Sequence, residues 1–404
     1  MSTSLLYHGF GIRDYAYVRT HYAGGRIVFG IRRRSERLCC PVCGTSEVTC
    51  EGVVPRELRS LPIGGKPTFV ALEVQRVGCA RCQCVRQDTL EFARPKKRST
   101  RAFERYALEL SQRMTIQDAA RHLGVSWDVV KGIQKEHLQR RYGKPRLKHL
   151  KFLAIDEISI GKGHRYLTVV LDWNSGAIVF VGDGKGADAL KPFWKRLRAS
   201  RARVEAVAID MSAAYINAVG EHLPNATLVF DHFHVIKLFN DKLSDLRRDV
   251  QREAETTQQK EVLKGTRWLL LKNPENLDDQ KNERQRLEEA LELNKPLATA
   301  YYMKEDLRTL WNQPDKPTAT KRLDDWVKRA EVSGIRMLQR FAKTLSAHRS
   351  GILAYYDFPL STGPLEGTNN KIKTMKRQAY GFRDHEFLKL KIYGIHETKY
   401  ALIG

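Results

Sequence analysis

The 404-residue sequence contains no uncharged apolar run that approaches the roughly 18 residues of a membrane-spanning helix. Its first residues, MSTSLLYHGFGIRDY, lack the apolar core and the small-residue cleavage site of a secretory leader. Acidic residues are also scarce, because 46 Asp and Glu stand against 70 Lys and Arg, a formal charge of +24. We therefore expect a cytoplasmic protein without a membrane partner, and its charge predicts a polyanionic partner, most often nucleic acid.

Cysteine is absent outside one short segment, since all seven cysteines lie between Cys39 and Cys84. In a reducing compartment such a cluster indicates a metal site rather than a disulfide framework. The segment contains two C-x-x-C knuckles, and each places two thiolates in one tight turn, as tetrahedral zinc requires. We predict one structural Zn²⁺ per chain, bound by Cys40, Cys43, Cys79 and Cys82.

The gap between the two knuckles is longer than in compact zinc ribbons, so it must contain strands of its own, and PTFVALEVQRV supplies one. Cys39 and Cys84 are competing ligands, and Cys50 is spare. The alternative interpretation is a set of buried free thiols. Hydrophobic residues make up 42% of the chain, which excludes general disorder, and there is no internal repeat.

Positive charge is concentrated near the N-terminus. Residues 1–150 hold 28 basic and 13 acidic residues, a net +15, whereas the remaining 254 hold 42 and 33. The runs YAYVRTHY and RIVFGIRR flank Gly24-Gly25 and predict a β-hairpin. A basic, Pro-containing linker near residue 95 then separates a β and zinc-binding domain (residues 1–95) from a helical domain (residues 96–147).

The helical domain contains a helix-turn-helix pattern between Thr115 and Leu138. Its apolar spacing predicts two short helices that pack across a turn at Gly124, with Ser126 capping the second. An ordinary helical hairpin is the alternative, but the neighbouring knuckles and basic linkers favour DNA binding. The candidate DNA contacts are Arg121, Trp127, Lys131, Gln134 and Lys135.

Beyond residue 148 the hydrophobic pattern changes to a period of two. Three β-rich runs are followed by helix, strand, helix, strand and a long helix from about His234, which is the element order of a ribonuclease H fold. We therefore predict a multidomain α/β protein. Its ribonuclease H-like core occupies residues 148–236 and 359–404 and is interrupted by an all-helical insertion at 237–358, with breaks at Asn273-Pro274 and between Asn312 and Pro317.

Two aspartates stand beside apolar strand segments, Asp156 in AIDEI and Asp210 in VAIDM. Such carboxylates are costly to bury unless they are paired, hydrogen-bonded or bound to metal. In the predicted fold their strands are neighbours, and a third acid, Glu366, opens the last helix, with Asn370, Lys373 and Arg377 on its face. Three carboxylates can hold two Mg²⁺ ions for phosphodiester chemistry. Helix capping or ion pairing would explain the positions of the two aspartates equally well. Glu157, Asp172 and Asp231 are the rival candidates for the acidic residues of the site.

The order CPVCG, CARC, helix-turn-helix, AIDEISIGKGHRYLTVVLD, AIDMSAAY, FDHFHVIK and GPLEGTNNKIKTMKRQAYGFRD resembles the ISL3 family of bacterial insertion-sequence transposases over nearly the whole chain. The resemblance implies a DDE transposase whose catalytic, metal-binding triad is Asp156, Asp210 and Glu366. It also implies an accessory active-site role for Asp231 and His234, although His234 is equally well read as a packed histidine at a helix start.

The resemblance implies cleavage of transposon ends with two Mg²⁺ (or Mn²⁺) ions and joining of the 3′-OH to target DNA. Double-stranded DNA, as terminal inverted repeats and target, is the expected partner, with Lys373, Lys376 and Arg377 as candidate backbone contacts. We expect a homodimer or larger assembly at the bacterial nucleoid. Two alternatives remain: a DNA-binding regulator with an inactive ribonuclease H-like domain, and a nuclease of that superfamily that does not join ends.

Overall fold

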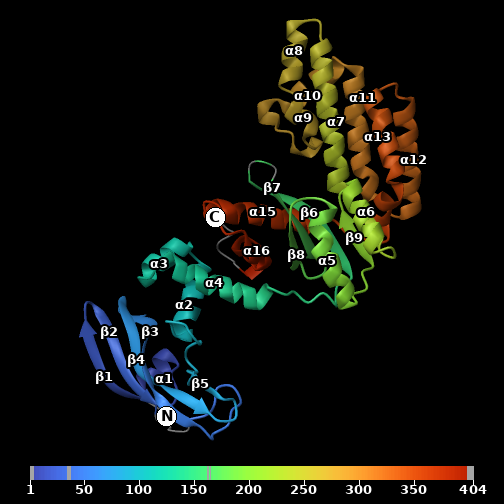
Figure 1. Ribbon diagram of the computed structural model, residues 1–404. Helices are drawn as coiled ribbons and strands as arrows, with labels where there is room; N and C mark the ends of the chain where they lie inside the picture. The colour runs from blue at the N-terminus through green and yellow to red at the C-terminus, as the bar shows by residue number, and fades with distance from the viewer. Residues whose placement is uncertain (1–3, 34–37, 162, 164, 398–404) are drawn as a thin grey trace. The chain divides into compact units, whose positions relative to one another are not determined.

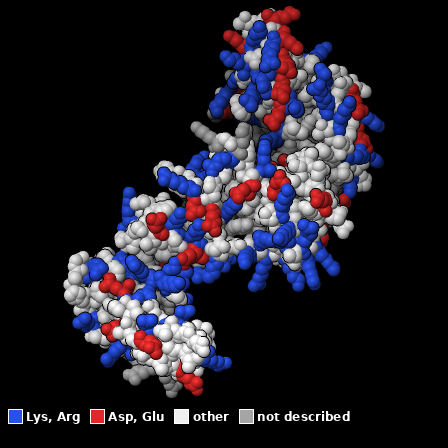
Figure 2. All heavy atoms as spheres, in the orientation of Figure 1, with Lys and Arg blue, Asp and Glu red and all other residues white. Residues whose placement is uncertain are grey.

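A computed structural model describes residues 4–33, 38–161, 163 and 165–397 (Figure 1). The chain forms two units. The first consists of residues 1–143 and 374–404, and the second consists of residues 144–373. Among the described residues, no helix combines the length and the apolar character that crossing a membrane requires. Lys and Arg side chains are spread over the drawn face of both units (Figure 2).

The first unit begins with a short helix, α1 (Leu5–Phe10), and a five-stranded sheet of order β1-β2-β4-β3, in which β5 pairs with β4. The strands are β1 (Tyr15–Ala23), β2 (Arg26–Arg33), β3 (Thr49–Ile63), β4 (Lys66–Cys79) and β5 (Cys84–Gln87). The predicted β1–β2 hairpin is confirmed, and both glycines of its turn have positive φ. Between the two knuckles lie two long strands, as the length of the gap indicated: PTFVALEVQRV lies in β4, and Gly64-Gly65 makes the hairpin turn that joins it to β3.

The helix-turn-helix pattern is also confirmed as a set of packed helices: α2 (Arg101–Ser111), α3 (Ile116–Leu123) and α4 (Trp127–Tyr142). Gly124 ends α3 in the left-handed conformation, with φ +61°. The predicted cap at Ser126 is wrong in one respect, since Ser126 occupies the N-cap position of α4 but its side chain makes no capping hydrogen bond. A small core that includes Phe103, Leu123 and Val130 holds the three helices together.

Buried Arg59 joins this helical bundle to the sheet. It lies in β3, and its guanidinium stacks over the rings of Phe69 and Phe103 at 5.0 and 5.7 Å. Its Nη2 donates a 2.7 Å hydrogen bond to the carbonyl oxygen of Leu123, at the end of α3. One side chain therefore contacts a strand, the core of α2 and the free carbonyl end of α3.

The second unit contains a five-stranded sheet of order β10-β9-β6-β7-β8 (Figure 1). β6 (Phe152–Gly161), β7 (Arg165–Asp172) and β8 (Ile178–Asp183) form an antiparallel meander, whereas β9 (Ala206–Ile209) and β10 (Thr227–Phe230) run parallel to β6. The parallel strands are linked through α5 (Ala187–Ser200) and α6 (Ala213–His222). The predicted order of strands and helices is confirmed.

Helices follow β10 without a further strand among the described residues, and they share one apolar core with the sheet. They are α7 (His232–Glu253), α8 (Thr257–Lys264), α9 (Arg267–Leu271), η1 (Pro274–Asn276), η2 (Asp279–Lys281), α10 (Glu283–Glu292), α11 (Lys295–Arg308), η3 (Thr309–Asn312), α12 (Lys316–Val332), α13 (Arg336–Ala347), α14 (Arg349–Leu353) and η4 (Ala354–Tyr356). The predicted breaks lie at η1 and between η3 and α12. Trp326, Phe239 and Phe341 pack edge to face at their centre, with ring centroids 4.9–6.0 Å apart.

The chain then returns to the sheet and to the first unit. α15 (Gly363–Gln378) begins in the second unit and ends in the first. α16 (His385–Tyr393) and η5 (Ile395–Glu397) belong to the first unit, where α16 packs against α4 (Figure 1).

Candidate functional site

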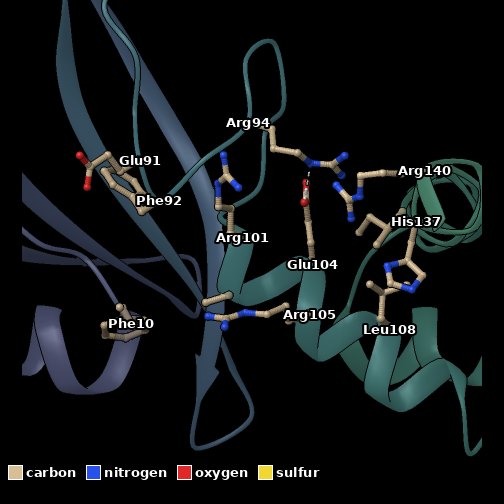
Figure 3. Close-up of a pocket in the computed structure, with 13 residues that line it drawn as sticks. Phe10, Glu91, Phe92, Arg94, Arg101, Glu104, Arg105, Leu108, His137 and Arg140 are labelled. Atoms are coloured by element: carbon tan, nitrogen blue, oxygen red, sulfur yellow. Dashed lines mark hydrogen bonds and ion pairs between the residues drawn. The ribbon is translucent and has the colours of Figure 1, made fainter.

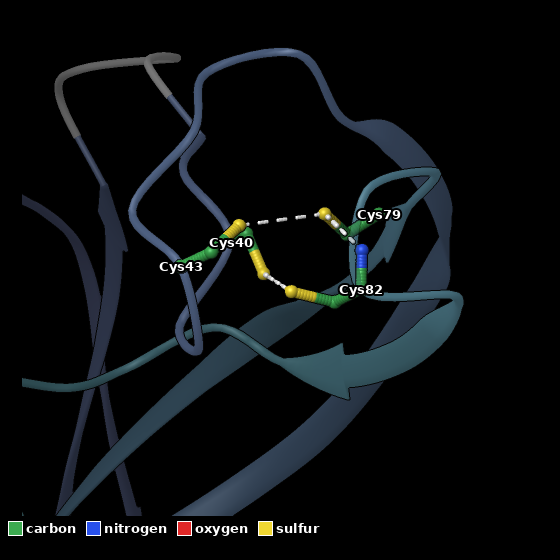
Figure 4. Close-up of side chains that lie close together, drawn as sticks. All are labelled: Cys40, Cys43, Cys79 and Cys82. Atoms are coloured by element: carbon green, nitrogen blue, oxygen red, sulfur yellow. Dashed lines mark hydrogen bonds between the residues drawn. The ribbon is translucent and has the colours of Figure 1, made fainter.

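The structure brings the four cysteines of the two knuckles together (Figure 4). Cys40 and Cys43 lie in the loop before β3, whereas Cys79 ends β4 and Cys82 lies in the turn before β5. The Sγ atoms of Cys43 and Cys79 are 3.7 Å apart, and those of Cys40 and Cys82 are 4.0 Å apart. A tetrahedron with Zn–S bonds of about 2.3 Å has edges of about 3.8 Å, so the four thiols fit one zinc ion.

Backbone amides of both knuckles point at sulfur. The amide of Val42 donates to Cys40 Sγ and that of Cys82 donates to Cys79 Sγ, each at 3.4 Å. Hydrogen bonds from the backbone of Cys43 and Val42 lower the pKa of the Cys40 thiol to about 6, which favours the thiolate that binds metal. The competing cysteines Cys39, Cys50 and Cys84 lie outside the group of four.

Asp156 and Asp210 lie level with each other on neighbouring parallel strands. β6 and β9 pair in register, with Ala154 opposite Ala208, and each aspartate follows two residues later. Asp210 comes directly after the end of β9, as expected for an acid at a strand end. Asp156, in contrast, lies inside β6, because this strand continues to Gly161 against β7. Both side chains are half-buried and share one edge of the sheet.

Asp156 accepts two hydrogen bonds of 2.7 Å, one from the backbone amide of Glu157 and one from the Nδ2 of Asn369 in α15. Burial raises the pKa of Asp156, nearby His234 lowers it, and the like charge of Asp210 raises it further. The two acids, the histidine and the amide therefore form one polar cluster.

Glu366 lies in the first turn of α15, three residues before Asn369, so the two share a side of this helix. Two contacts hold the chain that leads into α15. Trp173 Nε1 donates to the carbonyl oxygen of Ser361 at 3.2 Å, and Thr362 Oγ1 donates to Asp231 Oδ2 at 2.6 Å. Glu366 itself is exposed, and among the described residues the three acids do not gather as closely as the four thiols. Their carboxylate oxygens are nevertheless the donor type that Mg²⁺ and Mn²⁺ prefer.

The rival acids have structural partners. Glu157 accepts from the hydroxyl of Tyr215 at 2.6 Å and from the amide of Gly186 at 3.1 Å. Buried Asp172 is bonded to the Ser175 hydroxyl in the turn after β7. Asp231, which is 1% exposed, holds Thr362 and begins α7. His232 Nδ1 lies 3.4 Å from Asp231 Oδ1, and the His232 ring packs against the rings of Trp311 and Tyr355.

The candidate DNA contacts of the helix-turn-helix have different surroundings. Arg121 and Trp127 are exposed. Gln134 is buried, and Lys131 and Lys135 form ion pairs with residues of α16 and its N-cap. In α15, Lys373 and Arg377 are exposed and Lys376 is half-buried.

Sequence reasoning missed the role of Asn369. The sequence placed Asn370 on the face of Glu366, but the structure buries Asn369 against Asp156 and leaves Asn370 exposed. Either residue, at i+3 or i+4, fits the helical period, so the pattern alone could not choose between them. The sequence also gave no indication of the contacts of Asp384 and Glu386, because the residues around them do not show that they meet lysines some 250 positions earlier.

Comparison with known proteins matches each part of the chain to a transposase family. Residues 153–392 match a family described as "Transposase", residues 89–138 match "Helix-turn-helix domain of transposase family ISL3", and residues 36–82 match "zinc-finger of transposase IS204/IS1001/IS1096/IS1165". With two carboxylates level on adjacent strands and a four-thiol cluster, these matches define a DDE-type transposase with zinc-binding and helix-turn-helix parts.

The chain belongs to the ISL3 family of transposases. It is 34% identical over 358 residues to "Transposase for insertion sequence element IS1001" of Bordetella parapertussis, which covers 88% of each chain. It is 29% identical over 393 residues to "Transposase for insertion sequence element IS1557" of Mycobacterium tuberculosis, over 90% of this chain and 87% of the relative. The "Drosophila P element transposase strand transfer complex" has a TM-score of 0.32 at 12% identity over 63% of this chain and 79% of its own, too low to support an argument about the fold.

Proposed function

We propose that this transposase binds the terminal inverted repeats of an insertion sequence, hydrolyses a phosphodiester at each end with Mg²⁺ or Mn²⁺, and joins the resulting 3′-OH to target DNA. The observation that carries the proposal is the level placement of Asp156 and Asp210. The helix that bears Glu366 is tied to this pair through the Asn369–Asp156 hydrogen bond.

The second unit supports a ribonuclease H-like assignment. Its sheet has an antiparallel meander of three strands, and two parallel strands extend it beside the first strand of the meander. We assign residues 148–236 and 359–404 to this core, although residues 374–404 cluster with the first unit, and the helices of 237–358 to an insertion between β10 and α15. Residues 1–95 and 96–147 are assigned to the zinc-binding and helix-turn-helix domains.

In the proposed mechanism, Asp156, Asp210 and Glu366 would hold two divalent cations, which would supply charge neutralisation and water activation. Asn369 fixes the orientation of the Asp156 carboxylate through its 2.7 Å hydrogen bond. Water attacks the phosphorus, the bond from phosphorus to the 3′-oxygen breaks, and that oxygen takes up a proton as the 3′-OH. The same residues then position this hydroxyl against a target phosphodiester.

The zinc-binding and helix-turn-helix parts are proposed to bind DNA as one body, with a single Zn²⁺ in the four-thiol site. The Arg59 contacts support this, since they join the sheet to the ends of α2 and α3. Trp127 remains a candidate for base contact, and Arg121, Lys373, Lys376 and Arg377 remain candidates for contact with the DNA backbone. Asp231 and His234 remain candidates for accessory roles. Because two ends must be brought together, we propose a homodimer or larger assembly at the nucleoid.

The test uses the full-length protein, Mg²⁺ or Mn²⁺, and a labelled duplex that carries one transposon end. Asp156→Asn and Asp210→Asn should each abolish cleavage and leave binding of the duplex unchanged. Asp188→Asn is the matched control, because Asp188 is exposed on α5 and pairs with Lys191 on the same helix. Cleavage by either active-site variant would disprove the assignment. Cleavage without insertion into a second DNA would instead identify a nuclease, and binding without cleavage would identify a regulator.

A further inference from the structure

One face of α4 is covered by the C-terminal segment of the chain. Lys131, Lys135, Leu138 and Tyr142 share this face, since they follow one another at i, i+4, i+7 and i+11. Asp384, the N-cap of α16, lies 3.0 Å from Lys131 Nζ and 3.2 Å from Lys135 Nζ.

Further contacts extend the covered face along α4. Glu386 lies 2.6 Å from Lys135 Nζ, and the Lys131 ammonium also lies 5.9 Å from the ring centroid of Phe387. At the far end, a Cβ on Gly394 would lie 2.9 Å from Leu138 Cδ2 and 3.1 Å from Tyr142 Cε2. This is the face that a helix-turn-helix would place in the major groove, and α4 cannot present it to DNA while α16 is docked.

A groove on the first unit carries unpaired positive charge (Figure 3). Its cavity of about 470 Å³ lies between α1, the segment before α2, and helices α2 and α4. Arg101 and Arg105 come from α2, one turn apart, and Arg140 comes from the end of α4. None of these three has a carboxylate within ion-pair distance among the described residues.

The other charges of the groove are mostly matched. Arg94 pairs with Glu104 at 2.8 Å and with Glu136 at 2.7 Å. Glu91 is the remaining acid of the lining, so the three free guanidiniums outnumber it. Phe10, Phe92 and Leu108 form apolar parts of the wall. A second concave surface continues from this groove through Arg105 and Phe92 and adds Arg13.

We propose that the first unit binds the sugar-phosphate backbone of duplex DNA in this groove through Arg101, Arg105 and Arg140, and that the covered face of α4 serves as the docking surface of α16. The inference rests on the proposed function, which makes DNA the ligand. Charge complementarity identifies the occupant, because guanidinium forks match phosphate oxygens. These three arginines have no carboxylate partner in the described part of the chain, whereas the ammonium groups of Lys131 and Lys135 already face carboxylates.

The test measures binding of the full-length, zinc-loaded protein to a short fluorescein-labelled duplex of arbitrary sequence, by anisotropy over a range of salt concentrations. The groove variant is Arg101→Gln, Arg105→Gln and Arg140→Gln together. A control variant, Arg19→Gln, Arg32→Gln and Arg76→Gln together, removes the same charge from exposed positions on the strands of the same unit. Lys131→Gln with Lys135→Gln tests the α4 face. Zinc content and thermal unfolding must match the wild type for each variant compared.

The groove variant should bind about ten-fold more weakly or worse, and its slope of log K against log salt should flatten by about 0.9 for each lost phosphate contact. The control and the α4 variant should change the slope less. If the groove variant binds DNA as tightly as the control variant, the inference is overturned. It is also overturned if the α4 variant loses more affinity than the groove variant, because α16 would then leave α4 and α4 would enter the DNA groove. If the wild type cuts a transposon end and the groove variant binds DNA as tightly as the wild type, only the proposed role of the groove is refuted. Wild-type protein that neither binds nor cuts DNA refutes the proposed function.

Discussion

Lys135 Nζ lies 2.6 Å from Glu386 Oε2, which joins the helix-turn-helix to α16. Hydrogen bonds to Glu386 and Asp384 raise the pKa of Lys135. The pKa of Asp384 is lowered, first by the backbone amide of Phe387 and then by Lys131 and Lys135. The contact explains why residues 374–404 belong to the first unit although most of α15 lies in the second.

Replacing Asp384 by Asn should loosen α16 without removing its cap. Asp384 Oδ1 accepts a 2.9 Å hydrogen bond from the amide of Phe387, and Asn caps helices as well as Asp does. Only the charge is lost, so we expect the free energy of opening α16 to fall by about 1 kcal/mol, for the loss of two partly exposed ion pairs. Asp384→Ala should cost about 1 kcal/mol more, because it also removes the cap. Hydrogen exchange of the amides of 385–393 measures both, and equal protection in Asp384→Asn and wild type would contradict the role of the ion pairs.

Acid should loosen the same contact. Because the folded pKa of Asp384 is depressed, its stabilising contribution is fully present above the ordinary aspartate pKa of about 3.9 and is lost as the pH falls through the lower folded value. Exchange in α16, corrected for its intrinsic pH dependence, should therefore rise more steeply below about pH 4 in the wild type than in Asp384→Asn. Parallel profiles for the two proteins would rule out this titration.

Zinc should hold the short β5 strand in place. β5 pairs with β4 through only four residue pairs, from Arg76–Gln87 to Cys79–Cys84, and the turn between the strands carries Cys79 and Cys82. Cys79→Ser should reduce the zinc content from one per chain to near zero and increase proteolysis in residues 79–87. Elemental analysis and limited proteolysis measure the two effects.

Cys50→Ser is the matched control for the zinc prediction, because Cys50 is exposed and lies outside the thiol cluster. It should retain the metal and the protease resistance of the wild type. Loss of zinc in Cys50→Ser, or full zinc in Cys79→Ser, would contradict the assigned ligands.

Truncating Arg59 should separate the helical bundle from the sheet. Arg59→Ala removes a charged hydrogen bond to the Leu123 carbonyl and the packing over Phe69 and Phe103, for an expected loss of about 3 kcal/mol. The exposed Arg26, which lies 4.7 Å over the same Phe69 ring, is the control, and Arg26→Ala should cost less than about 1 kcal/mol. Chemical denaturation followed at the first unit tests both, and similar losses in the two variants would refute the role of Arg59.

Local periodicity was enough to predict the order of strands and helices from β6 to α7, but it did not indicate α1, β3, β5 or α16. The strand order follows from right-handed crossovers, and the register then places Asp156 beside Asp210 without further information. The C-x-x-C knuckles likewise predicted the thiol cluster, since each knuckle is local and a single ion demands that two of them meet.

The rest depends on packing between distant segments. Whether Lys131 and Lys135 face solvent or carboxylates is decided by a distant segment, since Asp384 lies 249 positions after Lys135. The local sequence pattern of a basic helix face is the same in both cases. Arg59 is similar, because an arginine in a strand is ordinarily a surface residue and only the contact with Leu123 and two aromatic rings buries it. Such long-range contacts leave no local periodicity.

Asn369 should control how Asp156 is oriented, and so how tightly the site binds metal. Its side chain is buried, and its Nδ2 donates to Asp156 Oδ2 at 2.7 Å. Asn369→Ala removes this donor, and loss of a partner behind a metal ligand typically costs about 10–100-fold in metal affinity or activity. We therefore expect cleavage of a labelled end to need a higher Mn²⁺ concentration, with partial rescue at saturating metal. Asn370→Ala, at the exposed neighbouring position, should behave as the wild type. An unchanged Mn²⁺ requirement in Asn369→Ala would show that the hydrogen bond has no part in catalysis.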